Sequence, residues 1–403
     1  MLTRYDNHAP ATYNYILKPP MTEFTNLPPL SLYIHIPWCI RKCPYCDFNS
    51  HEFNNTFPEN NYIAALIEDL EQQLPSIWGR RIISLFIGGG TPSLFSPRAL
   101  DNLLSAIRSR LTCLPDMEIT LEANPGTVDQ NKFSEFHSIG INRLSIGIQS
   151  FNDDHLKKLG RIHTGRDAIS AVEIAHKSGF DNFNLDLMFG LPEQTQQQGI
   201  SDLANAIDLE PAHISWYQLT IEPNTFFYKQ TPVLPDDDDI WTLQQQGQVL
   251  LQERGFNQYE ISAYAKPSRQ CQHNLNYWQF GDYLALGAGA HGKVSRSDNN
   301  SINRYWKQRQ PQAYIEASPE EKTAGSSTLE TDDIIFEFML NALRLKEGFD
   351  IQVFETHTGL STDLINPACQ QAIEKGLLEK NEQHLKPTEL GYRFLNDLIN
   401  LFN

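Results

Sequence analysis

The chain lacks any long hydrophobic run. No stretch among its 403 residues approaches the roughly 20 apolar residues that a membrane-spanning helix needs, and no apolar run follows Arg4 as it would in a secretion signal. With 40% hydrophobic and 20% charged residues, the composition is ordinary for a water-soluble globular protein. We therefore expect a cytoplasmic protein without a membrane span.

Positive charge is also scarce. The 49 acidic residues outnumber the 32 basic residues, which gives a formal net charge of −17. A surface of this charge repels nucleic acids and anionic membranes rather than attracting them. We expect neither as a partner.

Cysteine is too sparse for the disulfide framework of a small secreted protein, and its placement is uneven. Three of the six cysteines are scattered: Cys113, Cys271 and Cys369. The other three, Cys39, Cys43 and Cys46, fall within one short segment. A [4Fe-4S] cluster usually takes four thiolates, so three would leave one iron open to a small chelating ligand. Structural zinc is the alternative, but it needs four ligands, and no second cysteine pair is present.

From residue 31 onward, short apolar or β-branched runs alternate with amphipathic helical stretches. This is the pattern of repeated βα units around a parallel sheet. The expected strands are 32–36, 83–87, 118–121, 143–148, 183–188 and 214–219. The clearest helical stripe between them consists of Ile63, Leu66, Ile67, Leu70 and Leu74. We predict an α/β fold with a partial, TIM-like (βα)6 barrel.

Residues suited to chemistry follow the predicted strands, and barrels of this kind build their sites at the carboxyl ends of strands. The cysteine segment follows the first strand, and Gly88-Gly89-Gly90-Thr91-Pro92 follows the second. Glycines let a ligand touch the backbone, and no Gly-Lys-Ser/Thr follows them as a phosphate loop would require. Glu122, Gln149 and Asp186 lie at the ends of the next three strands. Each alone is typical of a plain turn or a solvated loop, but their common position predicts one site.

The sequence as a whole suggests four regions. Residues 1–30 form an N-terminal extension, and the barrel occupies 31–235, ending near the acidic, proline-containing stretch 232–239. Residues 236–325 extend the barrel and are rich in glycine and aromatic residues. We expect residues 326–403 to form an additional winged-helix-like α+β domain.

The last region shows a helix beginning at 334–339 and a short hairpin between 376 and 387. Winged helices often bind DNA, but residues 331–403 hold 12 acidic and 6 basic residues, so a basic footprint is absent. We interpret this region as a packing or protein-contact unit.

The cysteine segment carries a resemblance to a known family. Tyr33, His35 and Pro37 precede it, and it ends in Cys-Pro-Tyr-Cys-Asp-Phe. These residues resemble the radical S-adenosylmethionine superfamily and, within it, the HemW-type haem chaperones, which are relatives of oxygen-independent coproporphyrinogen III oxidase. The resemblance covers the chain from about residue 30 onward. It implies that Cys39, Cys43 and Cys46 hold a [4Fe-4S] cluster whose open iron binds S-adenosylmethionine, which one electron can cleave to a 5'-deoxyadenosyl radical.

The same resemblance implies which residues contact S-adenosylmethionine. Aromatic residues would lie beside the cofactor, a glycine-rich loop would line its methionine end, and polar groups would hold its charged atoms. In that order the residues are Tyr33 and Tyr45; Gly89, Gly90 and Thr91; and Glu122, Gln149, Arg161 and Asp186. A guanidinium suits the methionine carboxylate, and either acid suits the amino group or the ribose hydroxyls.

A second motif, His273-Asn-Leu-Asn-Tyr277-Trp278, matches one that coproporphyrinogen oxidase-like proteins associate with haem or a haem-like substrate. The resemblance implies haem as cargo, with His273 supplying an axial nitrogen and an aromatic side chain covering a porphyrin face. A buried core histidine is the alternative. His291 and Cys271 are weaker candidates.

Two functions follow from the resemblance. One is a haem carrier that delivers haem to client haemoproteins, with respiratory proteins as candidates and an unidentified electron donor. The other is the oxidase itself, which removes propionate carboxyl groups of coproporphyrinogen III by radical chemistry. The oxidase pattern has a fourth cysteine where this chain has Phe48, and a longer arm where we expect only about 30 polar residues before the cysteines. Both differences favour the carrier.

Overall fold

The computed structural model describes residues 24, 26–52, 58–127 and 129–403. Most of the predicted N-terminal extension, residues 1–23 and 25, therefore lies outside the described residues. None of the helices in the described part of the chain is long and apolar enough to cross a lipid bilayer.

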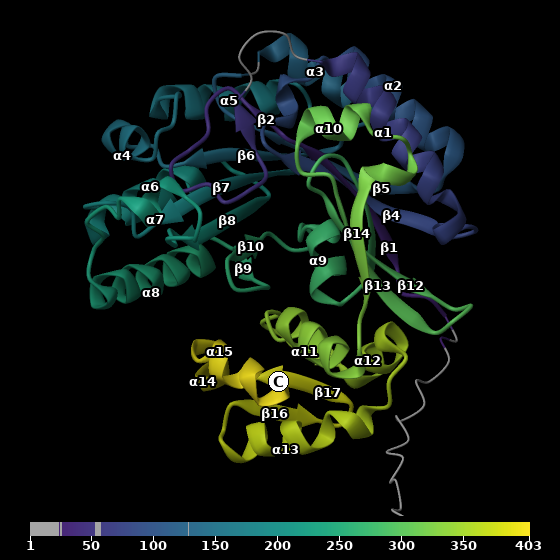
Figure 1. The fold of residues 1–403 in the computed structure, drawn as a ribbon. Coiled ribbons are helices and arrows are strands. Elements are labelled where there is room, and N and C mark those ends of the chain that lie inside the picture. Colours follow the sequence, from purple (N-terminus) through teal and green to yellow (C-terminus); the bar gives the residue numbers. More distant parts are fainter. Residues whose placement is uncertain (1–23, 25, 53–57, 128) are drawn as a thin grey trace, which may run out of the picture.

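A curved sheet of twelve strands forms the centre of this described structure (Figure 1). Its order is β14-β13-β12-β11-β1-β4-β5-β6-β7-β8-β10-β9. Six neighbouring strands are parallel: β1 (Leu30–Ile36), β4 (Arg81–Gly89), β5 (Thr112–Ala123), β6 (Arg143–Gln149), β7 (Phe183–Phe189) and β8 (His213–Gln218). They overlap the six predicted strands in chain order, so the prediction of repeated βα units is confirmed. Only β5 begins clearly earlier, because its exposed first residues continue the pairing with the start of β4.

Helices cover the apolar face of these strands. In chain order they are α1 (Glu59–Gln73), α2 (Pro97–Arg110), α3 (Gln130–Ser138), α4 (Asp153–Lys158), α5 (Gly165–Lys177) and α6 (Gln196–Asp208). The predicted stripe lies on α1 except for Leu74, which directly follows the helix; Ile63, Leu66 and Leu70 are buried in the main core with Leu32 and Ile34 of β1. Side-chain caps fix where helices start: Thr164 and Thr195 each form a capping box.

Successive side chains along a strand point to opposite faces of the sheet. Polar side chains of the parallel strands lie on the face opposite the helices. Ser31 of β1 and Ser84 of β4 form a hydrogen bond of 2.7 Å there. Helix α9 (Gln272–Trp278) closes this interior at the amino ends of the strands. The Glu118 carboxylate of β5 accepts hydrogen bonds from the backbone N–H groups of Gln272 and His273, both at 3.2 Å. The His-Asn-x-x-Tyr-Trp motif is thus held under the barrel.

Further strands extend both edges of the sheet. Four follow β1: β11 (Asp282–Leu286), which is parallel to it, and the antiparallel β12 (His291–Arg296), β13 (Ser301–Lys307) and β14 (Thr323–Thr328). At the other edge lie β10 (Ala263–Ala265) and β9 (Asn257–Gln258). The connecting helices are α7 (Phe226–Lys229), α8 (Asp237–Glu253) and α10 (Pro311–Glu316).

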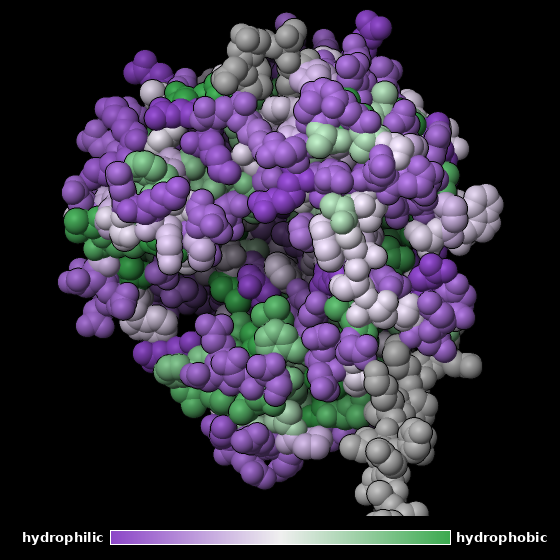
Figure 2. Space-filling view, viewed as in Figure 1, coloured by the Kyte–Doolittle hydropathy of each residue, from purple (hydrophilic) through white to green (hydrophobic). Residues whose placement is uncertain are grey.

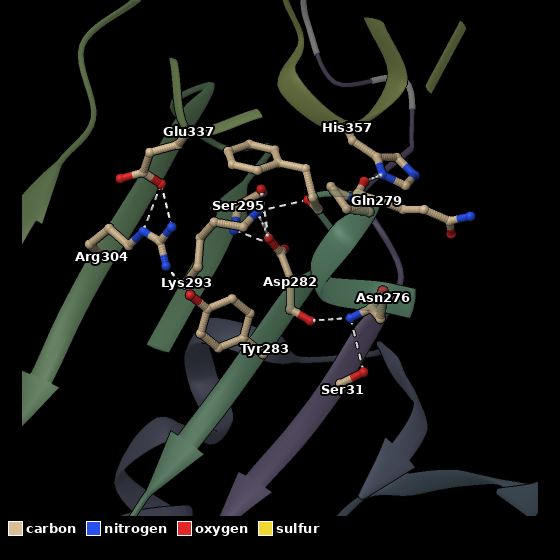
Figure 3. A network of polar contacts seen from close by, with 12 residues as sticks. Ser31, Asn276, Gln279, Asp282, Tyr283, Lys293, Ser295, Arg304, Glu337 and His357 are labelled. Atoms are coloured by element: carbon tan, nitrogen blue, oxygen red, sulfur yellow. Dashed lines mark hydrogen bonds and ion pairs between the residues drawn. The ribbon is translucent and has the colours of Figure 1, made fainter. Parts of the chain in front are cut away.

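A buried polar network joins this extension to its neighbours (Figure 3). Asp282 of β11 accepts from Lys293 Nζ at 3.0 Å and from the Ser295 backbone N–H at 2.8 Å, and it forms an ion pair of 2.8 Å with Arg80. An ion pair between Arg304 of β13 and Glu337 links the sheet to the C-terminal helices. The network fixes the extended edge to the rest of the molecule.

The C-terminal segment forms an α+β unit around its own apolar core (Figure 1). Its helices are α11 (Thr331–Ala342), α12 (Ile351–Thr358), α13 (Asn366–Glu374), α14 (Glu389–Arg393) and α15 (Leu395–Ile399). A small antiparallel sheet has the order β15 (Phe349–Asp350), β17 (His384–Pro387) and β16 (Leu378–Asn381). The helix expected near 334–339 and the hairpin expected between 376 and 387 are both present.

Candidate functional site

The carboxyl ends of the parallel strands surround a cavity of about 400 Å³. The predicted site residues that line it are Cys39, Cys43, Tyr45, Cys46, Gly89, Gly90, Thr91, Glu122, Gln149, Arg161 and Asp186. They come from six separate stretches of the chain, and the fold brings them to one rim. Figure 2 shows a largely hydrophilic surface that is hollowed near the centre of this view.

The three neighbouring cysteines stand on the loop after β1. Cys39 belongs to the short strand β2 (Trp38–Cys39), which pairs with β3 (His51–Glu52), and the Cys46 N–H donates to the Cys43 carbonyl at 3.1 Å. All three thiols are free and line the cavity. Within the part of the chain that the structure describes, no three His, Cys, Asp or Glu side chains converge to hold a single metal ion.

The glycine loop after β4 supports the cysteine loop directly. The N–H groups of Gly90 and Thr91 donate to the carbonyls of Ile36 and Trp38, both at 2.7 Å. A Cβ atom on Gly90 would lie 2.4 Å from the Trp38 carbonyl oxygen. Gly89 has φ +113°, and a Cβ there would lie 2.5 Å from the His35 ring. The sequence interpretation had these glycines making room for a ligand, but they also make room for the cysteine loop itself.

Arg161 reaches the cysteine loop from the turn after α4. One terminal nitrogen donates to Cys43 Sγ at 3.7 Å, and the other donates to the Gly147 carbonyl at 2.7 Å and to Asn124 Oδ1 at 2.9 Å. Its buried Nε has no hydrogen-bond partner among the described residues. The side chain thus places a fixed positive charge beside a thiol, with one donor unused.

Two carboxyl groups lie deeper in the same cavity. Glu122 accepts from the Gly89 N–H at 2.9 Å, and Asp186 accepts from Ser145 Oγ at 3.0 Å and from Asn184 Nδ2 at 2.8 Å. Burial, with the neighbouring Asp186 charge, raises the pKa of Glu122 to about 7. Burial also raises the pKa of Asp186, against the effect of its hydrogen bonds. This pair favours a ligand that brings positive charge or hydroxyl groups.

Gln149 ends β6 in a strained conformation, with φ 70° and a register shift between Gly147 and Gln149. A non-glycine residue with positive φ is costly and is common at functional sites. The Tyr217 hydroxyl donates to Gln149 Oε1 at 2.8 Å and holds the amide in the cavity. The sequence interpretation missed Tyr217, Asn124 and Ser145, although Asn124 follows a strand end and the other two occupy inward positions of predicted strands.

Two predicted residues lie elsewhere. Tyr33 donates to or accepts from His35 Nδ1 at 2.9 Å and lines a second cavity instead. His273 is 2% exposed and lines neither cavity; its Nδ1 lies 3.1 Å from Ser84 Oγ, and its ring packs 5.2 Å from that of Phe86. Burial, helped by the Arg143 charge, lowers the pKa of His273 to about 3, so the imidazole is neutral.

Comparison with known proteins agrees with this geometry. Residues 33–204 match the radical SAM superfamily, and residues 329–394 match the HemN C-terminal domain. The curated heme chaperone HemW of Escherichia coli (strain K12) is 49% identical to this chain, over 93% of this chain and 98% of its own length. This chain belongs to the HemW family. Heme chaperone HemW of Bacillus subtilis (strain 168) is 34% identical, over 92% of this chain and 98% of its own length.

A solved structure also resembles the fold of this chain. Coproporphyrinogen III oxidase (HemN) from Escherichia coli, described as a radical SAM enzyme, matches with a TM-score of 0.79 and 22% identity, covering 93% of this chain and 90% of that chain. The likeness extends over the barrel and the C-terminal unit, so it confirms the predicted fold class. In this HemW family member, Phe48 lines the cysteine cavity and is 63% exposed.

Proposed function

We propose that this protein is a haem chaperone: it binds haem, holds a [4Fe-4S] cluster together with S-adenosylmethionine, and delivers haem to client haemoproteins. The observation that carries the proposal is the 49% identity, over nearly the whole chain, to the curated heme chaperone HemW of Escherichia coli. The cavity at the strand ends supports it, because three free thiols and a charged, partly unsatisfied lining meet there.

The donor set fits an iron-sulfur cluster. A cubane binds each thiolate at a separate iron, so its three cysteines stand around it and need not converge on one point. Cys39, Cys43 and Cys46 would hold it, and the Arg161 guanidinium donates to the Cys43 sulfur. When bound, such a cluster supplies one electron and an open coordination position.

The rest of the cavity suits S-adenosylmethionine. The Arg161 guanidinium on this lining suits the methionine carboxylate, and Glu122 and Asp186 can accept from the amino group or the ribose hydroxyls. Tyr45 and Met188 offer apolar contact on the same lining. Gly89 and Gly90 remain proposed for the methionine end, whereas Tyr33, which lies outside this cavity, is left out of the proposal.

The competing function is oxygen-independent coproporphyrinogen III oxidase, whose fold this chain shares. We favour the chaperone because Phe48 stands where the oxidase pattern has its fourth cysteine. We further propose a cytoplasmic location, where a reducing environment keeps the thiols free.

An experiment with anaerobically reconstituted protein distinguishes the chaperone from the oxidase. The protein is incubated with haem and, separately, with coproporphyrinogen III, S-adenosylmethionine and a reductant. We expect a stable haem complex that passes haem to an apo-haemoprotein, and little or no decarboxylation. Steady conversion of coproporphyrinogen with consumption of S-adenosylmethionine would overturn the chaperone assignment.

A further inference from the structure

A second cavity, of about 630 Å³, adjoins the cysteine loop. Asp47 and Phe48 line both cavities, so this short segment is a wall common to the two. The other walls of the second cavity include Tyr33, Tyr277, Tyr283, His291, Trp306 and Arg309. Apart from Tyr33, none of these residues was predicted to contact the cluster or S-adenosylmethionine.

The extended edge of the sheet builds the aromatic part of this cavity. His291 of β12 pairs with Trp306 of β13 in the antiparallel register, so both side chains lie on one face of the hairpin. Their rings stack with centroids 6.5 Å apart and planes inclined by 29°. In the same lining, the rings of Tyr277 and Tyr283 lie 4.1 Å apart and are inclined by 32°. The space is therefore bounded by flat aromatic surfaces.

The cavity is tied to the cysteine loop through Asn49. Its side-chain amide donates to the carbonyls of Ala288 at 3.0 Å and Arg309 at 2.8 Å, and its own carbonyl lies 2.9 Å from His35 Nε2. These bonds hold the loop after the third cysteine against the β12–β13 side of the molecule. Phe48, next to Asn49, is 63% exposed.

Charge and exposure indicate what the cavity can accept. Arg309 forms no ion pair with any described residue, and it stands out in a chain of net charge −17, so it favours an anionic ligand. Trp306 is 37% exposed. His291 is exposed at the start of β12, so its imidazole can reach a metal-containing ligand in the cavity. A flat, apolar, metal-containing ligand with carboxylates meets all of these conditions, and the volume lies within the usual range for ligands of that size.

We propose that the haem cargo binds in this second cavity, with His291 as axial ligand, Trp306 and Phe48 against the porphyrin, and Arg309 paired with a propionate. The inference rests on the proposed haem-chaperone function and names the site that serves it. Exposed His291 can reach a ligand in this cavity without rearrangement of the core, which buried His273 cannot.

His273 then has a different role. Its ring lies 5.2 Å from that of Tyr277 and 6.4 Å from that of Tyr33, behind the wall that these two tyrosines form. It is a positioning residue for the aromatic wall. The His-Asn-x-x-Tyr-Trp motif contributes to the cavity through Tyr277, one helical turn after the histidine.

The test is a haem titration of the full-length, anaerobically reconstituted protein, followed by its absorption spectrum. His291→Ala should weaken haem binding at least roughly tenfold, because loss of even a hydrogen-bond partner of a metal ligand costs about that much affinity. It should also shift the haem absorption bands. Free imidazole added to His291→Ala should restore the wild-type spectrum, which shows that the variant is folded. Arg309→Gln should weaken binding without shifting the bands. His384→Ala, on the C-terminal hairpin, should match wild type in both respects.

Two results separate the inference from the function on which it rests. Wild-type protein that binds no haem would overturn the chaperone proposal and this site with it. Wild-type protein that binds haem, together with a His291→Ala variant of unchanged affinity and spectrum, would overturn this site alone. Loss of imidazole ligation in His273→Ala that free imidazole restores, with His291→Ala unaffected, would return the axial ligand to His273.

Discussion

The guanidinium of Arg161 donates to the Sγ atom of Cys43 at 3.7 Å, although the two residues lie 118 positions apart in the chain. The same side chain is anchored on the Gly147 carbonyl at 2.7 Å, so its charge has a fixed position. A fixed cation therefore stands beside one of the three proposed cluster ligands. The buried Nε of Arg161 has no hydrogen-bond partner among the described residues.

Arg161→Ala should weaken S-adenosylmethionine binding by about 1.5–3 kcal/mol, the usual value of a hydrogen bond to a charged group. Arg161→Lys should recover only part of the loss, because a lysine keeps the charge but loses the planar fork. Anaerobic calorimetric titration of the reconstituted protein measures both. Arg166→Ala, an exposed arginine on α5, is the matched control and should bind like wild type. Equal affinity of Arg161→Ala and the control would remove Arg161 from the site.

Gly90→Ala should prevent stable cluster retention, because the new Cβ would press against the Trp38 carbonyl and displace the cysteine loop. Gly79→Ala is the control. It has φ +79° with no atom within 4 Å of a new Cβ, so it should lose about 1–2 kcal/mol of folding stability but keep its iron. Iron per chain after gel filtration and the melting temperature separate the two effects. Full iron content in Gly90→Ala would contradict the steric role of this glycine.

Glu122 should make the stability of the apoprotein depend on pH near neutrality. Burial, with Asp186 nearby, raises the pKa of Glu122 to about 7 in the folded state, above its value in the unfolded chain. The unfolded chain therefore releases this proton first, and the free energy of unfolding falls as pH rises from about 4.5 through 7, by roughly 3 kcal/mol. Glu122→Gln cannot titrate and therefore does not lose this stability. In urea unfolding, its free energy of unfolding should rise relative to that of wild type between pH 5 and pH 8.

The exposed Glu173→Gln on α5 is the control for Glu122 and should follow wild type across this range. A stability difference between Glu122→Gln and wild type that is constant from pH 5 to pH 8 would show that Glu122 does not titrate there.

Asp282→Asn should destabilise the protein strongly, because it leaves the buried cations Lys293 and Arg80 without their shared carboxylate. Breaking a buried pair in this way costs about 3–5 kcal/mol. Burial alone would raise the pKa of Asp282, but these two cations and the Ser295 N–H hold it below its ordinary value. The stabilisation is therefore present above an ordinary aspartate pKa of about 4 and is lost as pH falls through the lower folded value.

Urea unfolding of the apoprotein at pH 7 measures the Asp282→Asn effect. The exposed Asp298→Asn, which loses only a surface pair with Arg296, should unfold like wild type. Equal midpoints for Asp282→Asn and Asp298→Asn would contradict the structural role of the network in Figure 3.

The sequence predicted the parallel strands and the cavity lining well, for a physical reason. Buried parallel strands need continuous apolar or β-branched runs, and the residues after them must meet at one edge of the sheet. Glu122, Gln149 and Asp186 could therefore be placed together without a structure. The long-range contact that makes Arg161 part of the site could come only from the family resemblance, since no local pattern links it to Cys43.

Positions that depend on which way a side chain points were harder to predict. Tyr33 follows the alternation of β1 into the barrel interior, where it borders the second cavity rather than the first. His273 is held under the barrel by Glu118, a contact between segments 155 residues apart. The sequence could identify the motif but not the depth at which its histidine lies.

Metal analysis and electron paramagnetic resonance of the anaerobically reconstituted protein test the three-thiolate site most directly. We predict about four irons with matching sulfide per chain, lost in Cys39→Ala, Cys43→Ala and Cys46→Ala but retained in Cys113→Ala, and a cluster spectrum that changes when S-adenosylmethionine is added. One zinc per chain without sulfide would contradict the cluster. An intact cluster whose spectrum is unchanged at saturating S-adenosylmethionine would contradict the open iron.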